Sequence, residues 1–311
     1  ETNYVPIGKQ PDSPIYLTPR KTWNVFIPPG LYGGGMASKS LVERLEEQRR
    51  KIEAWMKKIR HKVAILSGKG GVGKSTLAVN MAACLAMEGR VGKVGILDAD
   101  MTGPTIPKML GIRGTSLVAG PPGIFPVVGP LGIKVVSMDF MLPSDETPVI
   151  WRGPMKSMAI RQLLSEVVWG ELDFLVVDLP PGTGDEALTV AQSIPGLDGS
   201  VIVTIPSEVS QLVVKKAVTF SRKLNVPVIG VVENMSGLVC PYCGAVIDLF
   251  GKGGGKRMAE ELGVKFLGSV PLDPRLRESC DEGVPFVMKY PDSPASEAIR
   301  KIVSGMLEAL P

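Results

Sequence analysis

The stretch from residue 63 to residue 76 most constrains how this chain can fold, because it joins a buried strand, a glycine-rich loop and the start of a helix. The apolar run Val63-Ala-Ile-Leu66 comes first. Gly68-Lys-Gly-Gly-Val-Gly-Lys-Ser75 follows with the spacing G-x-x-x-x-G-K-[ST], and the residues after it have helical apolar spacing. A strand, a loop and a helix in this order are typical of α/β proteins with parallel sheets.

The chemistry of this loop indicates a phosphate site. Its glycines allow a backbone that points successive N–H groups at phosphate oxygens, and the helix adds its positive dipole end. Lys74 is placed to reach the terminal phosphates and Ser75 to bind Mg²⁺. We predict a nucleoside triphosphate site rather than an empty glycine-rich turn. The residues predicted to form it are Gly68, Lys69, Gly70, Gly71, Val72, Gly73, Lys74, Ser75 and Thr76.

Lys69 is unusual, because one phosphate chain does not need two lysines from the same loop. It lies inside the loop, five residues before Lys74. It is either a solvated lysine on a tight turn or a residue that points away from its own nucleotide. In the second case it would serve the nucleotide of a neighbouring subunit.

Carboxylates end two further apolar runs. Asp178 ends Phe174-Leu-Val-Val, and Asp98 and Asp100 follow Val94-Gly-Ile-Leu97. Asp178 is placed to hold a Mg²⁺-bound water beside Ser75. With a single histidine in the chain, a carboxylate or a main-chain carbonyl must orient the attacking water. We predict that Asp98 belongs to the Mg²⁺ shell and Asp100 orients the water, although the two roles could be exchanged.

The turn Cys240-Pro-Tyr-Cys243-Gly is the second strong motif. It presents two thiolates to one metal centre, and the extended pattern of residues 245–250 disfavours a thioredoxin-type pair. Because zinc usually takes four ligands, we predict that two chains each donate Cys240 and Cys243 to one Cys₄ site at a dimer axis. Such a site suits zinc or an iron–sulfur cluster. Cys280 is either a third ligand or a buried thiol, and Cys84 is expected in the core.

Composition excludes several other classes. The chain is 44% hydrophobic and 21% charged, and its apolar runs are too short to span a bilayer. Four irregularly spaced cysteines and a polar start without a secretory signal favour the cytoplasm. His61 is expected to be an exposed linker residue. The basic residues of 39–62 are expected to form a solvated face, so neither nucleic acid nor a membrane is predicted as a partner.

The pattern of elements predicts an α/β, doubly wound, mostly parallel sheet with a P-loop NTPase core and helices on both faces. Residues 1–35 contain six prolines and are predicted to be an extended arm, either a fused segment introduced for expression or a genuine tail that docks on a surface. An amphipathic helix is predicted over 36–62. Residues 63–311 would form the ATPase domain, with a CxxC insertion near 236–250.

Together these motifs resemble one family. Gly68–Thr76 is similar to the deviant phosphate loop of the nitrogenase iron protein, MinD and ParA. Further stretches, spread over roughly residues 60–310, resemble the Mrp family of ATP-binding iron–sulfur cluster carriers. These are Asp98-Ala-Asp-Met-Thr-Gly-Pro, Asp178-Leu-Pro-Pro-Gly-Thr-Gly-Asp185, Glu233-Asn-Met-Ser236 with the cysteine turn, and Val270-Pro-Leu-Asp-Pro274.

The resemblance implies a homodimeric ATPase that uses ATP and Mg²⁺, with slow hydrolysis coupled to cluster handling. Lys69 would reach the partner subunit's nucleotide, and Cys240 and Cys243 would hold a bridging [4Fe-4S] cluster for transfer to apo iron–sulfur proteins. Asn234 would contact adenine, and the base pocket would be lined by Pro271, Leu272 and Asp273. The alternative is a ParA/MinD-like positioning or regulatory ATPase with structural zinc.

Overall fold

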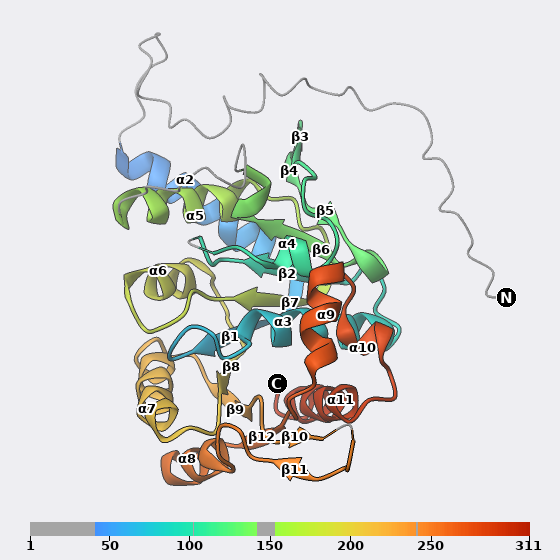
Figure 1. The fold of residues 1–311 in the computed structure, drawn as a ribbon. Coiled ribbons are helices and arrows are strands. Elements are labelled where there is room, and N and C mark those ends of the chain that lie inside the picture. The colour runs from blue at the N-terminus through green and yellow to red at the C-terminus, as the bar shows by residue number, and fades with distance from the viewer. Residues whose placement is uncertain (1–40, 102, 142–152, 241) are drawn as a thin grey trace, which may run out of the picture. The chain divides into compact units, whose positions relative to one another are not determined.

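The computed structural model describes residues 41–101, 103–141, 153–240 and 242–311, and these form a layered α/β fold (Figure 1). Its main sheet has eight strands. In spatial order they are β12 (Phe266–Ser269), β9 (Val228–Glu233), β8 (Gly199–Thr204), β1 (Ile59–Ser67), β7 (Leu172–Asp178), β2 (Val94–Asp98), β6 (Lys134–Ser137) and β5 (Val127–Val128). All neighbours are parallel except β5 and β6. The predicted fold class is therefore confirmed.

Helices cover both faces of this sheet, which explains why its central strands are continuous apolar runs. One layer contains α3 (Lys74–Met87), α4 (Ile106–Met109), α9 (Pro274–Glu282), α10 (Phe286–Lys289) and α11 (Pro294–Leu307). The other contains α2 (Leu41–Met56), α5 (Gly153–Glu166), α6 (Asp185–Ser193), α7 (Glu208–Lys223) and α8 (Gly254–Leu262). None of the helices in the described ranges is long and apolar enough to cross a membrane.

The strand order places the candidate site residues at one edge of the sheet. From β1 the chain builds β2, β6 and β7 on one side, then β8, β9 and β12 on the other. The order therefore reverses at β1, and ligands bind at such points beyond the strand carboxyl ends. Register aligns Asp98 with Asp178, and Thr204 with Glu233.

The boundary between the first helix and the first strand differs from the prediction. The predicted helix over 36–62 is too long, because α2 ends at Met56 and β1 already begins at Ile59. Both elements have buried apolar residues at this junction, Met56 and Ile59 being 2% exposed. Residues 36–40 and the proline-rich 1–35 lie outside the described residues.

The prediction that His61 is an exposed linker residue is wrong. It lies within β1, and its ring stacks on Phe174 with the centroids 5.2 Å apart. The next residue, Lys62, is buried, and its polar groups have partners. Its Nζ donates to the carbonyl of Ile59, and its backbone N–H donates to the carboxylate of Asp198. Buried polar groups are tolerated when they find such partners.

The predicted insertion near 236–250 contains a small antiparallel pair, β10 (Leu238–Val239) and β11 (Val246–Ile247). A second short pair, β3 (Val118–Gly120) and β4 (Gly123–Phe125), lies outside the main sheet. The 3₁₀ turns η2 (Pro130–Gly132) and η3 (Met138–Met141) flank β6. The cysteine motif thus lies on an appendage of the core and not in it.

Candidate functional site

The glycine-rich loop connects β1 to α3 in a backbone conformation that its sequence requires. Gly71 and Gly73 have φ values of 76° and 82°, in the left-handed region that favours glycine. A Cβ on Gly73 would lie 2.2 Å from Nδ2 of Asn234, so a side chain there would displace the Asn234 amide from the Val72 carbonyl. Val72 between them is buried. The loop is therefore held in a fixed shape that leaves its backbone N–H groups at the start of a helix.

Three predicted residues meet at the start of α3. Nζ of Lys74 lies 2.6 Å from Oδ1 of Asp178, and Oγ of Ser75 donates to Oδ2 of the same carboxylate at 2.5 Å. Lys74 is 6% exposed and Asp178 is 0% exposed. Asp178 thus occupies both groups that the sequence assigns to phosphate and Mg²⁺, and a nucleotide would have to compete for them.

Asp98 lies beside this group on the neighbouring strand and is also buried. It accepts hydrogen bonds from Oγ of Ser137 at 3.0 Å and from the backbone N–H groups of Ile106 and Asp100. Burial, and then the nearby charge of Asp178, raise the pKa of Asp98 to about 8. Burial also raises the pKa of Asp178, against the opposing effect of Lys74.

Burial disfavours the charged forms of these two carboxyl groups, and a cation bound beside them would favour those forms again. Carboxylate and hydroxyl oxygens are the ligands that Mg²⁺ prefers. The donor set of Asp98, Asp178 and Ser75 therefore fits the ion that the sequence predicts. Asp100 is less buried, and its Oδ1 accepts from the backbone N–H of Gly103.

Lys69 differs from Lys74 in its surroundings. It is half-buried, and no hydrogen bond or ion pair within residues 41–101, 103–141, 153–240 and 242–311 involves its side chain. A lysine in the phosphate loop that has no partner among the described residues is compatible with the predicted contact to a second subunit.

The two thiols lie at the tip of the β10–β11 hairpin. The backbone N–H of Cys240 donates to the carbonyl of Ala245, and that of Gly244 donates to the carbonyl of Cys240, both at 2.9 Å. Backbone N–H groups of Tyr242 and Cys243 and the Cys243 thiol lower the pKa of Cys240, which favours the thiolate that binds metal. Cys243 is exposed.

Exposed apolar side chains surround these thiols. Tyr242, between the two cysteines, is 96% exposed, and Val239 is 51% exposed. The same segment carries the exposed residues Val246, Ile247, Leu249 and Phe250. Apolar clusters of this kind mark surfaces that bind a partner.

Cys280 does not join the thiol pair. Its thiol is hydrogen-bonded to the side chain of Thr76 at the phosphate loop, and burial raises its pKa. The described part of the chain contains no group of three or more His, Cys, Asp or Glu side chains that could hold a metal ion. Of the two predictions for Cys280, the structure therefore favours a partly buried thiol. Cys84 is buried in the core, as predicted.

The residues predicted to bind adenine connect the loop and the hairpin. Nδ2 of Asn234 donates to the carbonyl of Val72 at 2.8 Å. Leu272 pairs with Leu238 of β10 in an isolated bridge. Asp273 caps α9 and binds the Arg275 guanidinium at 2.7 Å, which lowers the pKa of Asp273. Pro271 is half-buried between them.

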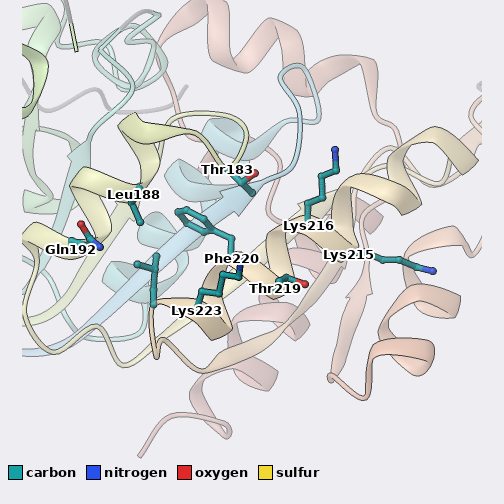
Figure 2. Close-up of a pocket in the computed structure, with 9 residues that line it drawn as sticks. Thr183, Leu188, Gln192, Lys215, Lys216, Thr219, Phe220 and Lys223 are labelled. Carbon is teal, nitrogen blue, oxygen red and sulfur yellow. The ribbon is translucent and has the colours of Figure 1, made fainter. Parts of the chain in front are cut away.

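A separate hollow of about 490 Å³ opens between α6 and α7 (Figure 2). Its lining consists of Thr183, Leu188, Gln192, Lys215, Lys216, Thr219, Phe220, Lys223 and Leu224. Thr183 belongs to residues 179–184, the loop after Asp178, which is fixed to β1 by the Gly182 N–H to Ser67 carbonyl hydrogen bond. None of the site residues predicted from the sequence lines this hollow.

The comparison with known families identifies the fold and its lineage. Residues 58–307 match the family model described as "NUBPL iron-transfer P-loop NTPase", within the ParA group. The chain belongs to this family. A relative from Methanocaldococcus jannaschii, named iron-sulfur cluster carrier protein, is 59% identical over 85% of this chain and 90% of its own length. One of the same name from Saccharolobus solfataricus is 56% identical over 83% and 86%.

Solved structures agree with this assignment to the iron-transfer P-loop NTPases. The nucleotide-binding protein of Archaeoglobus fulgidus, solved in complex with ADP, is 40% identical with a TM-score of 0.68, over 76% of this chain and 91% of that one. MinD of Pyrococcus horikoshii, complexed with Mg-ADP, shares the fold at 22% identity and a TM-score of 0.57, over 79% and 94%. The relatives favour the cluster-carrier prediction over the positioning ATPase.

Two buried polar residues of the site were not assigned a role from the sequence. Ser137 ends β6 and holds Asp98. Glu233 ends β9 and is 0% exposed. Each is the last residue of its strand, as Asp98 and Asp178 are of theirs. A search for polar residues that end apolar strands could therefore have found both.

Proposed function

We propose that this chain is an ATP-hydrolysing carrier of iron–sulfur clusters that acts as a homodimer and delivers a [4Fe-4S] cluster to apo-proteins. The observation that carries the proposal is the pairing of two features in one chain: a preformed phosphate loop, and a hairpin with two thiols at its tip, one half-buried and one exposed. The names of the relatives from M. jannaschii and S. solfataricus support this function.

At the phosphate loop, the chain's own residues would bind and orient ATP. Backbone N–H groups of Gly71 to Ser75 would hold the phosphates, and Lys74 would exchange Asp178 for a phosphate oxygen. Ser75 with Asp98 or Asp178 would hold Mg²⁺, which neutralises charge on the phosphates. Lys69, whose side chain has no partner in the part of the chain that the structure describes, would contact the nucleotide bound by the second subunit.

At the hairpin, Cys240 and Cys243 would supply half of the ligands for one cluster. A [4Fe-4S] cluster held by protein thiolates takes four cysteines. Since the described residues of one chain bring only two thiols together, a second copy would complete the set. The exposed apolar residues around the thiols would then be covered by that copy.

The test is anaerobic reconstitution of the full chain with iron and sulfide, followed by metal analysis, visible spectroscopy and native mass spectrometry. We expect one [4Fe-4S] cluster for each dimer and Mg²⁺-dependent ATP hydrolysis. Cys280→Ser is the matched control, because Cys280 lies beside Thr76 and should leave the cluster unchanged.

Stoichiometric zinc in an intact dimer, with no absorbance from a cluster after reconstitution, would contradict the carrier proposal. A cluster that forms on a monomer would instead contradict the bridging arrangement. Transfer is tested by mixing the loaded protein with an apo-ferredoxin and following the appearance of its spectrum.

A further inference from the structure

Glu233 is a buried carboxyl group that the nucleotide and thiol sites do not themselves explain. It is 0% exposed at the end of β9. Its Oε1 accepts from Oγ of Ser236 at 2.6 Å and from the backbone N–H of Gly253 at 3.2 Å, and its Oε2 accepts from the N–H of Gly255 at 2.6 Å. Oγ of Ser269 also donates to Oε1 at 3.5 Å, so this buried carboxyl group is fully hydrogen-bonded and ties several segments together.

These donors lie at the two ends of the segment that carries the thiols. Ser236 begins the turn into β10, and Gly253 is the N-cap of α8, which follows the hairpin. Between them the hairpin has only two pairs of facing residues, and its side chains are mostly exposed. The hairpin itself has little packing, so its position is set at its two ends. Both ends meet Glu233, and the first end also pairs through its backbone with Val270 and Leu272.

The next residue in the chain contacts the nucleotide site. Nδ2 of Asn234 donates to the carbonyl of Val72 and closely approaches Gly73, while its backbone N–H donates to the carbonyl of Thr204 at 2.7 Å. A shift of the phosphate loop when it binds phosphate would therefore move Asn234. Glu233 is directly bonded to Asn234 and would transmit the shift to both ends of the hairpin segment.

We propose that Glu233 is a positioning residue that makes the exposure of Cys240 and Cys243 depend on the nucleotide at the phosphate loop. This inference rests on the proposed function, because only a cluster carrier would use such a change at the thiols, but its test requires no cluster. Coupling of this kind is reciprocal in binding, so nucleotide would alter the thiols and thiol occupancy would alter nucleotide affinity.

Glu233→Gln separates this role from simple loss of packing, because glutamine has nearly the same shape. Donors approach both oxygens of Glu233, so in either orientation the amide NH₂ would face an N–H or O–H donor. The matched control is Glu261→Gln on α8, where Glu261 pairs at the surface with Lys215.

The experiment measures alkylation of each cysteine by iodoacetamide in metal-free full-length protein, with site-resolved mass spectrometry. It is run without nucleotide, with ADP and with a non-hydrolysable ATP analogue, at matched dimer fractions checked by sedimentation. For the wild type and Glu261→Gln we expect the rate at Cys240 and Cys243 to change by about fivefold or more on nucleotide binding, the lower end of typical coupling.

For Glu233→Gln we expect nucleotide to bind while this change falls below about twofold, well short of typical coupling. A wild-type change retained in Glu233→Gln, or no change in the wild type, would overturn the proposal. If Glu233→Gln does not fold, Ser236→Ala removes one donor to the carboxyl group and should reduce the change, and an undiminished change overturns the proposal equally. Failed cluster reconstitution alongside intact coupling would reject the carrier function alone.

Discussion

The phosphate loop and the thiol hairpin are built in opposite ways. Around the loop, Lys74 and Asp178 are buried against each other, and the loop backbone is fixed by Asn234. At the hairpin, Cys243 is exposed and Tyr242 is 96% exposed. The buried polar groups of the first region find partners within one chain, and only the ligand and the proposed Lys69 contact come from outside it. The second has its reactive groups and apolar side chains directed outward, as expected of a site that another surface completes.

The comparison is tested most strongly at the thiols. In Cys240→Ala or Cys243→Ala, we expect complete loss of the reconstituted cluster, because two ligands of four would disappear from each dimer. Nucleotide affinity should match that of the metal-free wild type, since the hydrogen bonds of Lys74 and Ser75 do not involve the hairpin. Metal analysis and nucleotide titration of the same sample measure both. Full cluster occupancy in either variant would move the ligands elsewhere.

Lys69 tests whether the loop is as self-contained as its packing indicates. For Lys69→Ala we expect ATP turnover to fall by roughly 10³-fold, by analogy with charges supplied in trans to phosphoryl groups. Binding should be retained in large part, because Lys69 has no partner within the described residues of its own chain. Steady-state hydrolysis with parallel nucleotide titration is the measurement. Unchanged turnover would remove the cross-subunit role.

In contrast to Lys69→Ala, Lys74→Ala should lose nucleotide binding itself. We expect ATP affinity to fall at least about 30-fold, which corresponds to about 2 kcal/mol for one partner of a buried charge pair. The wild-type chain and Lys69→Ala are the controls in the same titration. The cluster should still assemble on the hairpin. Loss of the cluster together with nucleotide binding would mean that the two regions do not form independently.

The buried carboxyl pair predicts a pH dependence of the ligand-free protein. Because the pKa of Asp98 is raised to about 8, the folded state binds a proton that the unfolded state releases above pH 4. The stability that Asp98 contributes is therefore present below pH 4 and lost as pH rises to 8. In Asp98→Asn the part of the slope that comes from Asp98 should disappear, with a gain of at least about 1 kcal/mol at pH 8, while the part from Asp178 remains. Denaturant unfolding with chelator present measures it, and an unchanged slope would contradict the assignment.

The smallest effect is expected at His61, far from both regions. Burial lowers its pKa below the usual 6.5, so the stability it contributes is present above pH 6.5 and lost as pH falls through the folded-state value. The loss should be below about 1 kcal/mol, since the ring is only partly buried. NMR titration of this single histidine gives the pKa directly. A value above 6.5, or the same acid loss in His61→Gln, would contradict the prediction.

The sequence was informative where chemistry is local and less so where it depends on packing. The phosphate loop, Asp98 and Asp178 follow from a contiguous motif and from strand ends, and these are the residues that the structure brings together. The sequence does not reveal where α2 ends and β1 begins near Ile59, because the charged residues there have the composition of a solvated linker. Lys62 is buried only because the fold brings Asp198 next to it. Asp273 is predicted to line the base pocket, yet Asp followed by Pro274 is also the pattern of a helix N-cap, which is its role in α9. Its ion pair with Arg275 depends on side-chain conformation, which the sequence does not give.

The alignment of Asp98 with Asp178 across β2 and β7 has a consequence for how faithfully the site can form. Side chains alternate between the two faces of a strand, so a slip of one residue would turn a carboxyl group to the opposite layer of helices. No loop has to close to bring these two groups together. The hydrogen-bonded register of β2 and β7 thus determines where the two carboxyl groups lie. Once these strands have paired correctly, Asp98 and Asp178 are already side by side.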